Sequence, residues 1–185
     1  MEKGISEDCC AEQQVILLKQ ILAVLLEGSS CLGSSINGPQ HIAVERIIAR
    51  FDSKQGHGLA NFAADKFLRR FKDSKSHLYT DSGALEYAER LAGLFSLSSE
   101  VKERLVRCVA EAGWYGRLEI CARNYCGRVP SAAEVKLLFQ EYLKSAGYST
   151  SAEYVLAEYA KKYLSPDDAA TQIALVQARR ERAGY

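Results

Sequence analysis

From Ser82 onward, the chain repeats its own pattern at an interval of 34 residues. Glu100-Val101-Lys102 recurs as Glu134-Val135-Lys136, and Ala112-Gly113-Trp114 recurs as Ala146-Gly147-Tyr148. An interval of this length holds two short helices, and self-similarity at such a period is typical of stacked helical hairpins. The repeat therefore predicts that the second half of the chain consists of helix pairs.

The same interval separates three copies of an apolar helical face. In each copy the apolar residues stand at i, i+1, i+4 and i+5, a spacing that places them on one side of an α-helix. The three sets are Tyr87, Ala88, Leu91 and Ala92; Cys121, Ala122, Tyr125 and Cys126; and Val155, Leu156, Tyr159 and Ala160. Because the two cysteines occupy positions that other units fill with aliphatic or aromatic residues, we expect them to act as small buried hydrophobes.

Capping signals mark where the helices begin and end. Residues 131–134 and 150–153 have the Ser/Thr-x-x-Glu sequence of a capping box, and residues 165–168 place a serine before a proline and two acids. Gly113 and Gly147 are placed to close helices. Together with the apolar periodicity, these signals predict helices over 11–27, 40–51, 59–73, 82–95, 99–112, 115–126, 132–146, 150–164 and 167–182.

The N-terminal part of the chain carries a different pattern. Residues 11–27 are apolar nearly all round, which predicts a helix that is buried or docked against a partner. Residues 28–40 are rich in Gly and Ser, as linkers are. We therefore expect an all-α protein with two parts. Residues 1–39 hold the apolar helix and the linker, and residues 40–185 hold antiparallel helix pairs stacked as a short right-handed α-solenoid.

The stretch from Glu100 to Val135 resembles a tetratricopeptide or pentatricopeptide repeat. Its first helix ends in Ala-Gly, its second helix contains Leu118-Glu119, and its loop contains Gly127 and Pro130. The resemblance extends over about residues 82–185. It implies a stack of helices with a concave binding surface and no obligatory catalytic pocket. The Trp-Leu-Gly-Tyr core of tetratricopeptides is missing and the units are few, so no base-reading residue is carried over.

Composition narrows the classes of protein to which this chain can belong. Its 24 basic and 23 acidic residues give a net charge of +1, which does not favour a dedicated nucleic-acid binder. The most apolar run, Val15 to Leu26, contains Lys19 and is too short for a membrane span. The acidic N-terminal sequence has no basic segment of the kind that begins a secretory signal. We expect a soluble, cytoplasmic protein with reduced thiols, no membrane span and no cofactor.

The sequence contains few candidates for metal-ligating or catalytic residues. Cys108, Cys121 and Cys126 could ligate zinc, but the last two stand about 140° apart around a helix, and structural zinc sites favour closer cysteine pairs. His57, between two glycines, is a candidate acid–base residue, although a loop histidine usually has no such role. Without a phosphate-binding glycine loop or a diagnostic carboxylate pair, an enzyme is less expected than a binding protein.

Candidates for partner binding fall into two groups. Lys66, Arg69 and Arg70 form a basic helix face, which could contact phosphates or simply be solvated. Three aromatic residues suit a protein interface, because their rings pack while a polar end stays wet. They are Trp114, Tyr142 and Tyr148.

These observations favour a non-catalytic protein–protein interaction or scaffold module. The helix over 11–27 would pack on the stack, pair with a second copy of the chain or occupy a groove of a partner. RNA binding by a pentatricopeptide-like surface is the first alternative. A regulator or enzyme with a small-molecule site between helices is the second.

Overall fold

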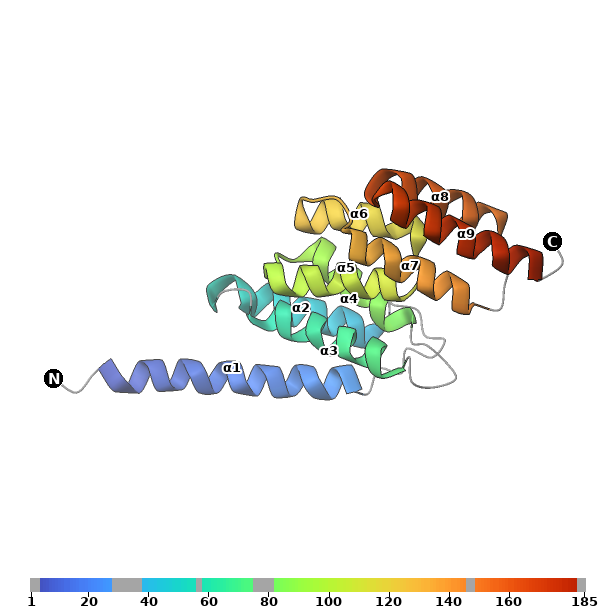
Figure 1. Cartoon of the computed structure of the whole chain (residues 1–185). Coiled ribbons are helices and arrows are strands. Elements are labelled where there is room, and N and C mark those ends of the chain that lie inside the picture. The colour runs from blue at the N-terminus through green and yellow to red at the C-terminus, as the bar shows by residue number, and fades with distance from the viewer. Residues whose placement is uncertain (1–3, 28–37, 56–57, 75–81, 146–148, 183–185) are drawn as a thin grey trace. The chain divides into compact units, whose positions relative to one another are not determined.

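The computed structural model describes residues 4–27, 38–55, 58–74, 82–145 and 149–182. These ranges are almost entirely helical and contain no strand, so the all-α prediction is confirmed (Figure 1). The helices are α1 (Gly4–Glu27), α2 (Pro39–Gln55), α3 (Gly58–Ser74), α4 (Ser82–Leu94), α5 (Ser99–Glu111), α6 (Tyr115–Cys126), α7 (Ala132–Lys144), α8 (Thr150–Tyr163) and α9 (Pro166–Arg182).

Each predicted helix is present, and two of them are longer than expected by several residues. α1 begins at Gly4 instead of residue 11, because neither Gly nor Pro interrupts the chain between Gly4 and Glu27. α2 was expected to end at residue 51 but runs on to Gln55. The extra turn includes Asp52, whose carboxylate accepts the backbone N–H of Leu59 at 3.1 Å and that of Ala60 at 3.2 Å. Asp52 thus caps the start of α3 from the neighbouring helix.

Backbone contacts divide the chain into two compact units, Met1–Val101 and Lys102–Tyr185. In the first unit α3 packs against α2 and α4, and α1 packs against both α2 and α3. The predicted division near residue 39 stays a prediction, although α1 lies in the same unit as α2 to α4.

The core of the first unit is centred on Tyr87 of α4, which is fully buried. Its ring meets that of Phe67 edge to face, with centroids 4.7 Å apart, and its hydroxyl donates to the His41 carbonyl of α2 at 3.0 Å. Nearby, Arg90 of α4 donates to both carboxylate oxygens of Glu45 in α2, at 2.7 and 3.1 Å. Aromatic packing and polar bonds together hold the first turns of α2 against α4.

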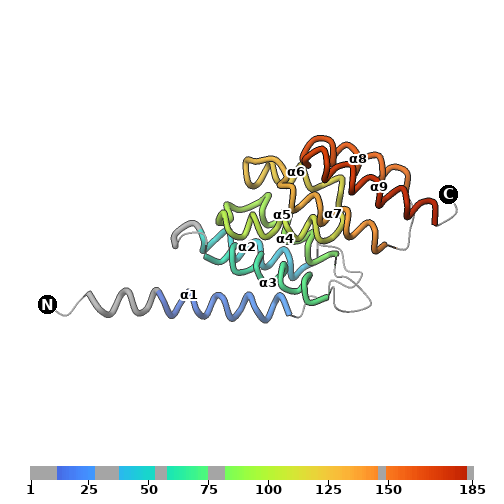
Figure 2. The backbone as a smooth tube through the Cα atoms, viewed as in Figure 1, coloured from blue at the N-terminus to red at the C-terminus, as the bar shows by residue number. Residues whose placement is uncertain are grey.

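In the second unit two helices contact the helix two places along the chain. α6 contacts α8 and α7 contacts α9, while α8 also contacts α7 and α9 (Figure 2). α5, α7 and α9 begin at Ser99, Ala132 and Pro166, intervals of 33 and 34 residues. This regular spacing is compatible with a helical repeat.

The repeated apolar sets lie on the inner faces of their helices, as the sequence predicts. Of the twelve residues, nine are buried: Tyr87, Ala88, Leu91, Ala92, Cys121, Ala122, Leu156, Tyr159 and Ala160. Tyr125, Cys126 and Val155 are half-buried. The repeat in the sequence is therefore a repeat of the buried face.

The segment between α6 and α7 is fixed by an arginine. α6 ends at Gly127, whose φ of 66° is in the left-handed region that favours glycine. The next residue, Arg128, donates from Nε to Glu103 of α5 at 2.9 Å and from Nη2 to Glu134 of α7 at 2.7 Å. Glu134 is buried and completes the predicted capping box, since its carboxylate accepts the N–H of Ser131 at 2.8 Å.

The ionisation of Glu134 is set by two opposing effects. Burial opposes the charged form, but the hydrogen bonds from Arg128 and Ser131 outweigh it and hold the pKa of this carboxyl below its usual range. Glu134 therefore stays ionised and hydrogen-bonded inside the protein. The stretch from Glu111 to Val135, which contains two cysteines and a lone tryptophan, therefore has a structural role: it forms helix ends, a cap and ion pairs.

One predicted cap is wrong by a single residue. Thr150 is the first residue of α8, not its cap, and Ser149 accepts the N–H of Ala152 at 3.3 Å. Ser149 has the extended backbone that a capping residue requires, with φ −147° and ψ 111°. The predicted cap at Ser165 is confirmed, since its hydroxyl accepts the N–H of Asp168 at 3.2 Å.

Two further predictions concern glycines and the linker. Gly113 has a φ of 72° two residues after the end of α5, as predicted for a residue that closes a helix. Gly147 and residues 28–37 of the predicted linker lie outside the described residues.

Candidate functional site

α1 is apolar on two opposite sides, and the protein covers only one of them. α1 packs against α2 and α3 (Figure 1). Leu18, Leu22 and Leu26, which share one side of α1, are buried. On the other side four large aliphatic side chains are exposed to solvent: Ile16 at 56%, Leu17 at 55%, Ile21 at 42% and Val24 at 70%. Single exposed aliphatic residues are common on proteins, but a contiguous row of them marks an interaction surface.

The centre of this exposed side of α1 is uncharged. Among residues 12–27, a sector of about 120° around the helix axis holds six residues, which we call the α1 outer face: Gln13, Gln14, Leu17, Gln20, Ile21 and Val24. Ile16 lies about 40° beyond one edge of this sector, and Glu27 lies between Ile16 and that edge. The charged residues Glu12, Lys19 and Glu27 lie outside this sector.

The predicted basic segment lies in α3, close to the end of α1. Lys66 Nζ is 2.8 Å from Glu27 Oε1 of α1, and Arg69 Nε is 2.7 Å from Asp65 Oδ2. The hydrogen bond from Lys66 lowers the pKa of the Glu27 carboxyl. Lys66 and Arg69 are thus paired with carboxylates, and the Lys66 pair joins α3 to α1.

A groove of about 410 Å³ lies beside this ion pair, between α1 and α3. Its lining combines apolar residues with charges of both signs: Leu26, Glu27, Phe62, Asp65, Lys66, Phe67, Arg69, Arg70 and Asp73. The Lys66 ammonium also lies 5.9 Å from the centroid of the Phe62 ring. Because acids balance the bases, the groove does not present a basic surface to an anion.

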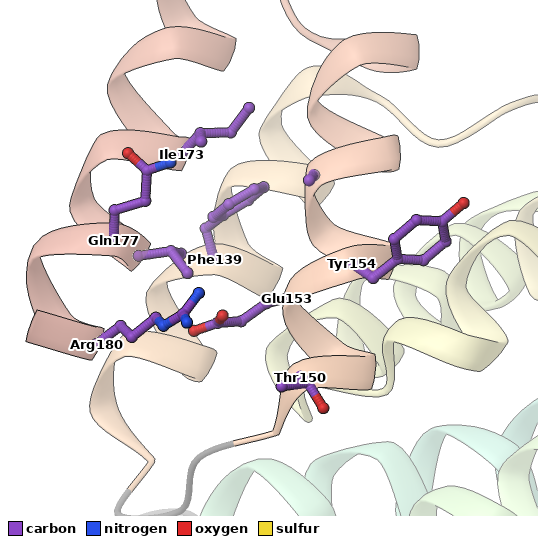
Figure 3. Close-up of a pocket in the computed structure, with 9 residues that line it drawn as sticks. Phe139, Thr150, Glu153, Tyr154, Ile173, Gln177 and Arg180 are labelled. Carbon is purple, nitrogen blue, oxygen red and sulfur yellow. The ribbon is translucent and has the colours of Figure 1, made fainter. Parts of the chain in front are cut away.

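A second, smaller groove of about 290 Å³ lies between α8 and α9 (Figure 3). Phe139 of α7 forms its back wall, and Arg180 of α9 points towards Glu153 of α8 at one end. Tyr154 is 70% exposed and its ring points away from the other labelled side chains. The groove is a shallow apolar slot with a charged end.

The aromatic residues predicted to contact a partner differ in how far they are exposed to solvent. Tyr142 is buried; its hydroxyl donates to Glu153 Oε1 at 3.1 Å, and the Arg179 guanidinium lies 4.6 Å from its ring centroid. Burial raises the pKa of this phenol. Tyr142 therefore joins α7 to α8 and α9 and offers little surface to a partner.

The other two aromatic candidates are Trp114 and Tyr148. Trp114 is half-buried at the start of α6, and the Arg117 guanidinium lies 4.8 Å from its ring centroid. Tyr148 lies outside the described residues.

The cysteines predicted to be buried are buried or half-buried. Cys108 and Cys121 are fully buried, and burial, helped by the nearby Glu103 carboxylate, raises the pKa of the Cys126 thiol to about 11. A thiol with so high a pKa is a poor nucleophile and a poor metal ligand, because both roles require the thiolate. In the part of the chain that the structure describes, no group of three His, Cys, Asp or Glu side chains could hold a metal ion. His57 lies outside that part.

No protein-family model, curated protein or solved structure matches this chain. The fold alone defines the class: an all-α protein whose helices pack against their neighbours, compatible with a helical repeat. Among the described helices, none has the length and apolar content that crossing a membrane requires.

The sequence predicted some of this site and missed the rest. The helix over 11–27 was expected to be buried or docked against a partner. One of its sides is buried against α2 and α3, whereas docking against a partner stays a prediction. Which side stays exposed could not be predicted, because both sides are aliphatic. The proximity of Lys66 to Glu27 was also missed, since 39 residues separate them in the chain.

Proposed function

We propose that this protein is a protein–protein interaction module that presents the α1 outer face to another protein chain. The observation that carries the proposal is the exposure of Leu17, Ile21 and Val24 on a helix whose opposite side is already packed on α2 and α3. Removing apolar surface from water is favourable by about 25 cal/mol per Å². A partner that covers these side chains would gain this free energy.

The packing of α1 supports this role. Leu18, Leu22 and Leu26 hold one side of the helix, and the Lys66–Glu27 ion pair holds its C-terminal end. A helix that is fixed before binding loses less conformational freedom when a partner docks. The rest of the chain then serves as the scaffold.

The finer proposal is that this scaffold is a short α-solenoid of helical hairpins. The intervals of 33 and 34 residues between α5, α7 and α9 support it, as do the contacts of α6 with α8 and of α7 with α9. Stacks of this kind commonly serve as extended binding surfaces. Protein binding is favoured over RNA binding because a phosphate would have to displace Glu27 from Lys66 and Asp65 from Arg69.

Site-specific photo-crosslinking in the native cell tests the proposed function. A photoreactive amino acid is placed at Val24, which is 70% exposed on α1, and in a control chain at Ile120, which is 54% exposed on α6. We expect a protein adduct at position 24 that is missing at position 120. An absence of protein adducts at position 24, or equal labelling at both positions, would contradict the proposal.

A further inference from the structure

We propose that the partner of the α1 outer face is a second copy of this chain, with two α1 helices pairing as a short coiled coil. This inference rests on the proposed function, since it names the partner for the same surface. Three features of the α1 outer face support it: the spacing of the exposed residues, their lack of charge and the small extent of the surface.

The spacing of the exposed residues is that of a coiled-coil seam. Gln14, Leu17, Ile21 and Val24 follow one another at intervals of three, four and three residues, and all four are exposed. Alternation of three and four places them at the a and d positions of a heptad, where side chains of two helices interlock. Ile21 then occupies an a position, and Leu17 and Val24 occupy d positions. The pair of Ile21 at a and Leu17 at d is the combination that favours two-stranded parallel assemblies, whereas the β-branched Val24 at d does not belong to it.

The charge of the α1 outer face also favours a second copy. A two-fold dimer brings the same patch of both chains together, so any net charge on that patch would repel itself. The six residues of the face carry no charge, and the nearby Glu27 already pairs with Lys66. The neutral face therefore meets its own copy without repulsion, and it offers a strongly charged partner no opposite charge.

The extent of the surface predicts a weak, reversible dimer. A standard stable interface buries about 800 Å² on each partner, whereas Ile16, Leu17, Ile21 and Val24 are the only large aliphatic side chains exposed on the described part of α1. Interfaces smaller than the standard size belong to weak, reversible associations, so we expect the dimer to dissociate on dilution. Dimer and monomer should both be present at accessible concentrations.

Sedimentation equilibrium of the purified full chain tests this inference. In reducing buffer, so that disulfides do not contribute, we expect the apparent mass to rise from 20.5 kDa towards twice that value as concentration increases up to about 1 mM. The double variants Leu17→Glu/Val24→Glu and Leu17→Lys/Val24→Lys should each stay monomeric. An equimolar mixture of the two should recover dimer, because opposite charges then face each other whether the helices run parallel or antiparallel.

The matched control places the same charges on other exposed aliphatic residues. The variant Ile120→Glu/Leu175→Glu changes side chains that are 54% and 43% exposed in α6 and α9, and it should dimerise like the wild type. Circular dichroism and urea unfolding check that each variant is folded. If a charged variant does not fold, Leu17→Gln/Val24→Gln replaces it and should raise the dissociation constant at least tenfold.

Three results would overturn the inference: a wild type that stays monomeric throughout, a Leu17→Glu/Val24→Glu variant that still dimerises, or folded variants of opposite charge that fail to pair. Failure here is distinguishable from failure of the proposed function. If the pure protein is monomeric but position 24 crosslinks to a different protein in cells, the dimer is wrong and the interaction module stands. If position 24 gives no protein adduct in cells, the module itself is wrong.

Discussion

Arg128 is the residue through which three segments of the second unit meet. Its guanidinium bonds to Glu103 of α5 and Glu134 of α7, and Nη1 also donates to the Val129 carbonyl at 2.9 Å. The guanidinium is planar and has five donors, so one side chain can satisfy two carboxylates and a carbonyl. A lysine has only three donors on one nitrogen and could not reproduce the bidentate bonds to both carboxylates.

We therefore expect Arg128→Gln to lower the free energy of unfolding by about 2 kcal/mol, because it leaves the buried Glu134 carboxylate without its main partner. Urea denaturation at neutral pH measures this change. Arg107→Gln is the control: it removes an exposed pair with Glu111 and should have a much smaller effect. The double variant Arg128→Gln/Glu134→Gln should recover part of the loss. If Arg128→Gln and Arg107→Gln cost the same, Arg128 has no special structural role.

Tyr87 supplies a second prediction at this scale. Its hydroxyl is the donor to the His41 carbonyl, inside a fully buried ring contact. Tyr87→Phe keeps the ring and removes one buried hydrogen bond, so it should lower the free energy of unfolding by about 1 kcal/mol. Tyr154→Phe, at a ring that is 70% exposed, should leave it unchanged. Equal midpoints of thermal unfolding for both variants would contradict the prediction.

At the scale of the helix, the sequence and the structure assign different N-cap residues to α8. The sequence predicts Thr150 as the cap, whereas the structure has Ser149 in that role. Ser149→Ala should therefore lower the free energy of unfolding by about 1 kcal/mol. Thr150→Ala should be neutral or slightly stabilising, since alanine has the higher helix propensity. Urea denaturation of the two single variants decides between the two assignments, and a larger loss for Thr150→Ala would restore the sequence prediction.

Helices were the part of this fold that the sequence predicted best. Apolar periodicity and capping signals are local, so they place α3 to α9 to within about two residues at each end. The α8 cap was missed by one position because Ser149 and Thr150 are both good capping residues. The extra turn of α2 was missed for another reason: Asp52 acts on Leu59 and Ala60 of the next helix, a contact that no local pattern contains.

At the scale of the whole molecule, ion pairs make stability depend on pH. Glu119 of α6 accepts hydrogen bonds from Lys162 and Arg123, which lower its pKa to about 2. The pKa of Glu103 is lowered by its hydrogen bond to Arg128, and that of Glu134 is also below its usual range. In an unfolded chain these carboxyls titrate near pH 4.3.

The sign of the effect follows from these pKa values. Between about pH 4.3 and pH 2 the unfolded chain binds more protons than the folded one, so stability falls as the pH is lowered through this range. We expect the urea midpoint to hold steady from pH 7 to 5 and then decline. Glu119→Gln should lower the midpoint at pH 7 and decline less steeply below pH 4. Parallel profiles for wild type and variant would show that Glu119 does not contribute.

The features of the whole molecule that the sequence did not predict depend on contacts between residues far apart in the chain. The 34-residue period indicates how helices follow one another, but not which partner each side chain finds. Tyr142, expected at a binding surface, is instead held by Glu153 and Arg179. The candidate binding face on α1 depends on which of two similar aliphatic sides α2 and α3 cover, and that choice is made only in the packed protein.

The capping of α3 by Asp52 has a consequence for protein engineering. Because a side chain of α2 accepts the backbone N–H groups of Leu59 and Ala60, the junction between the two helices is fixed by a contact across it. Asp52 therefore helps to set the position of α3 against α2. A short epitope or fluorophore-binding tag inserted between residues 55 and 58 should leave both helices in place, which offers a labelling position inside the chain.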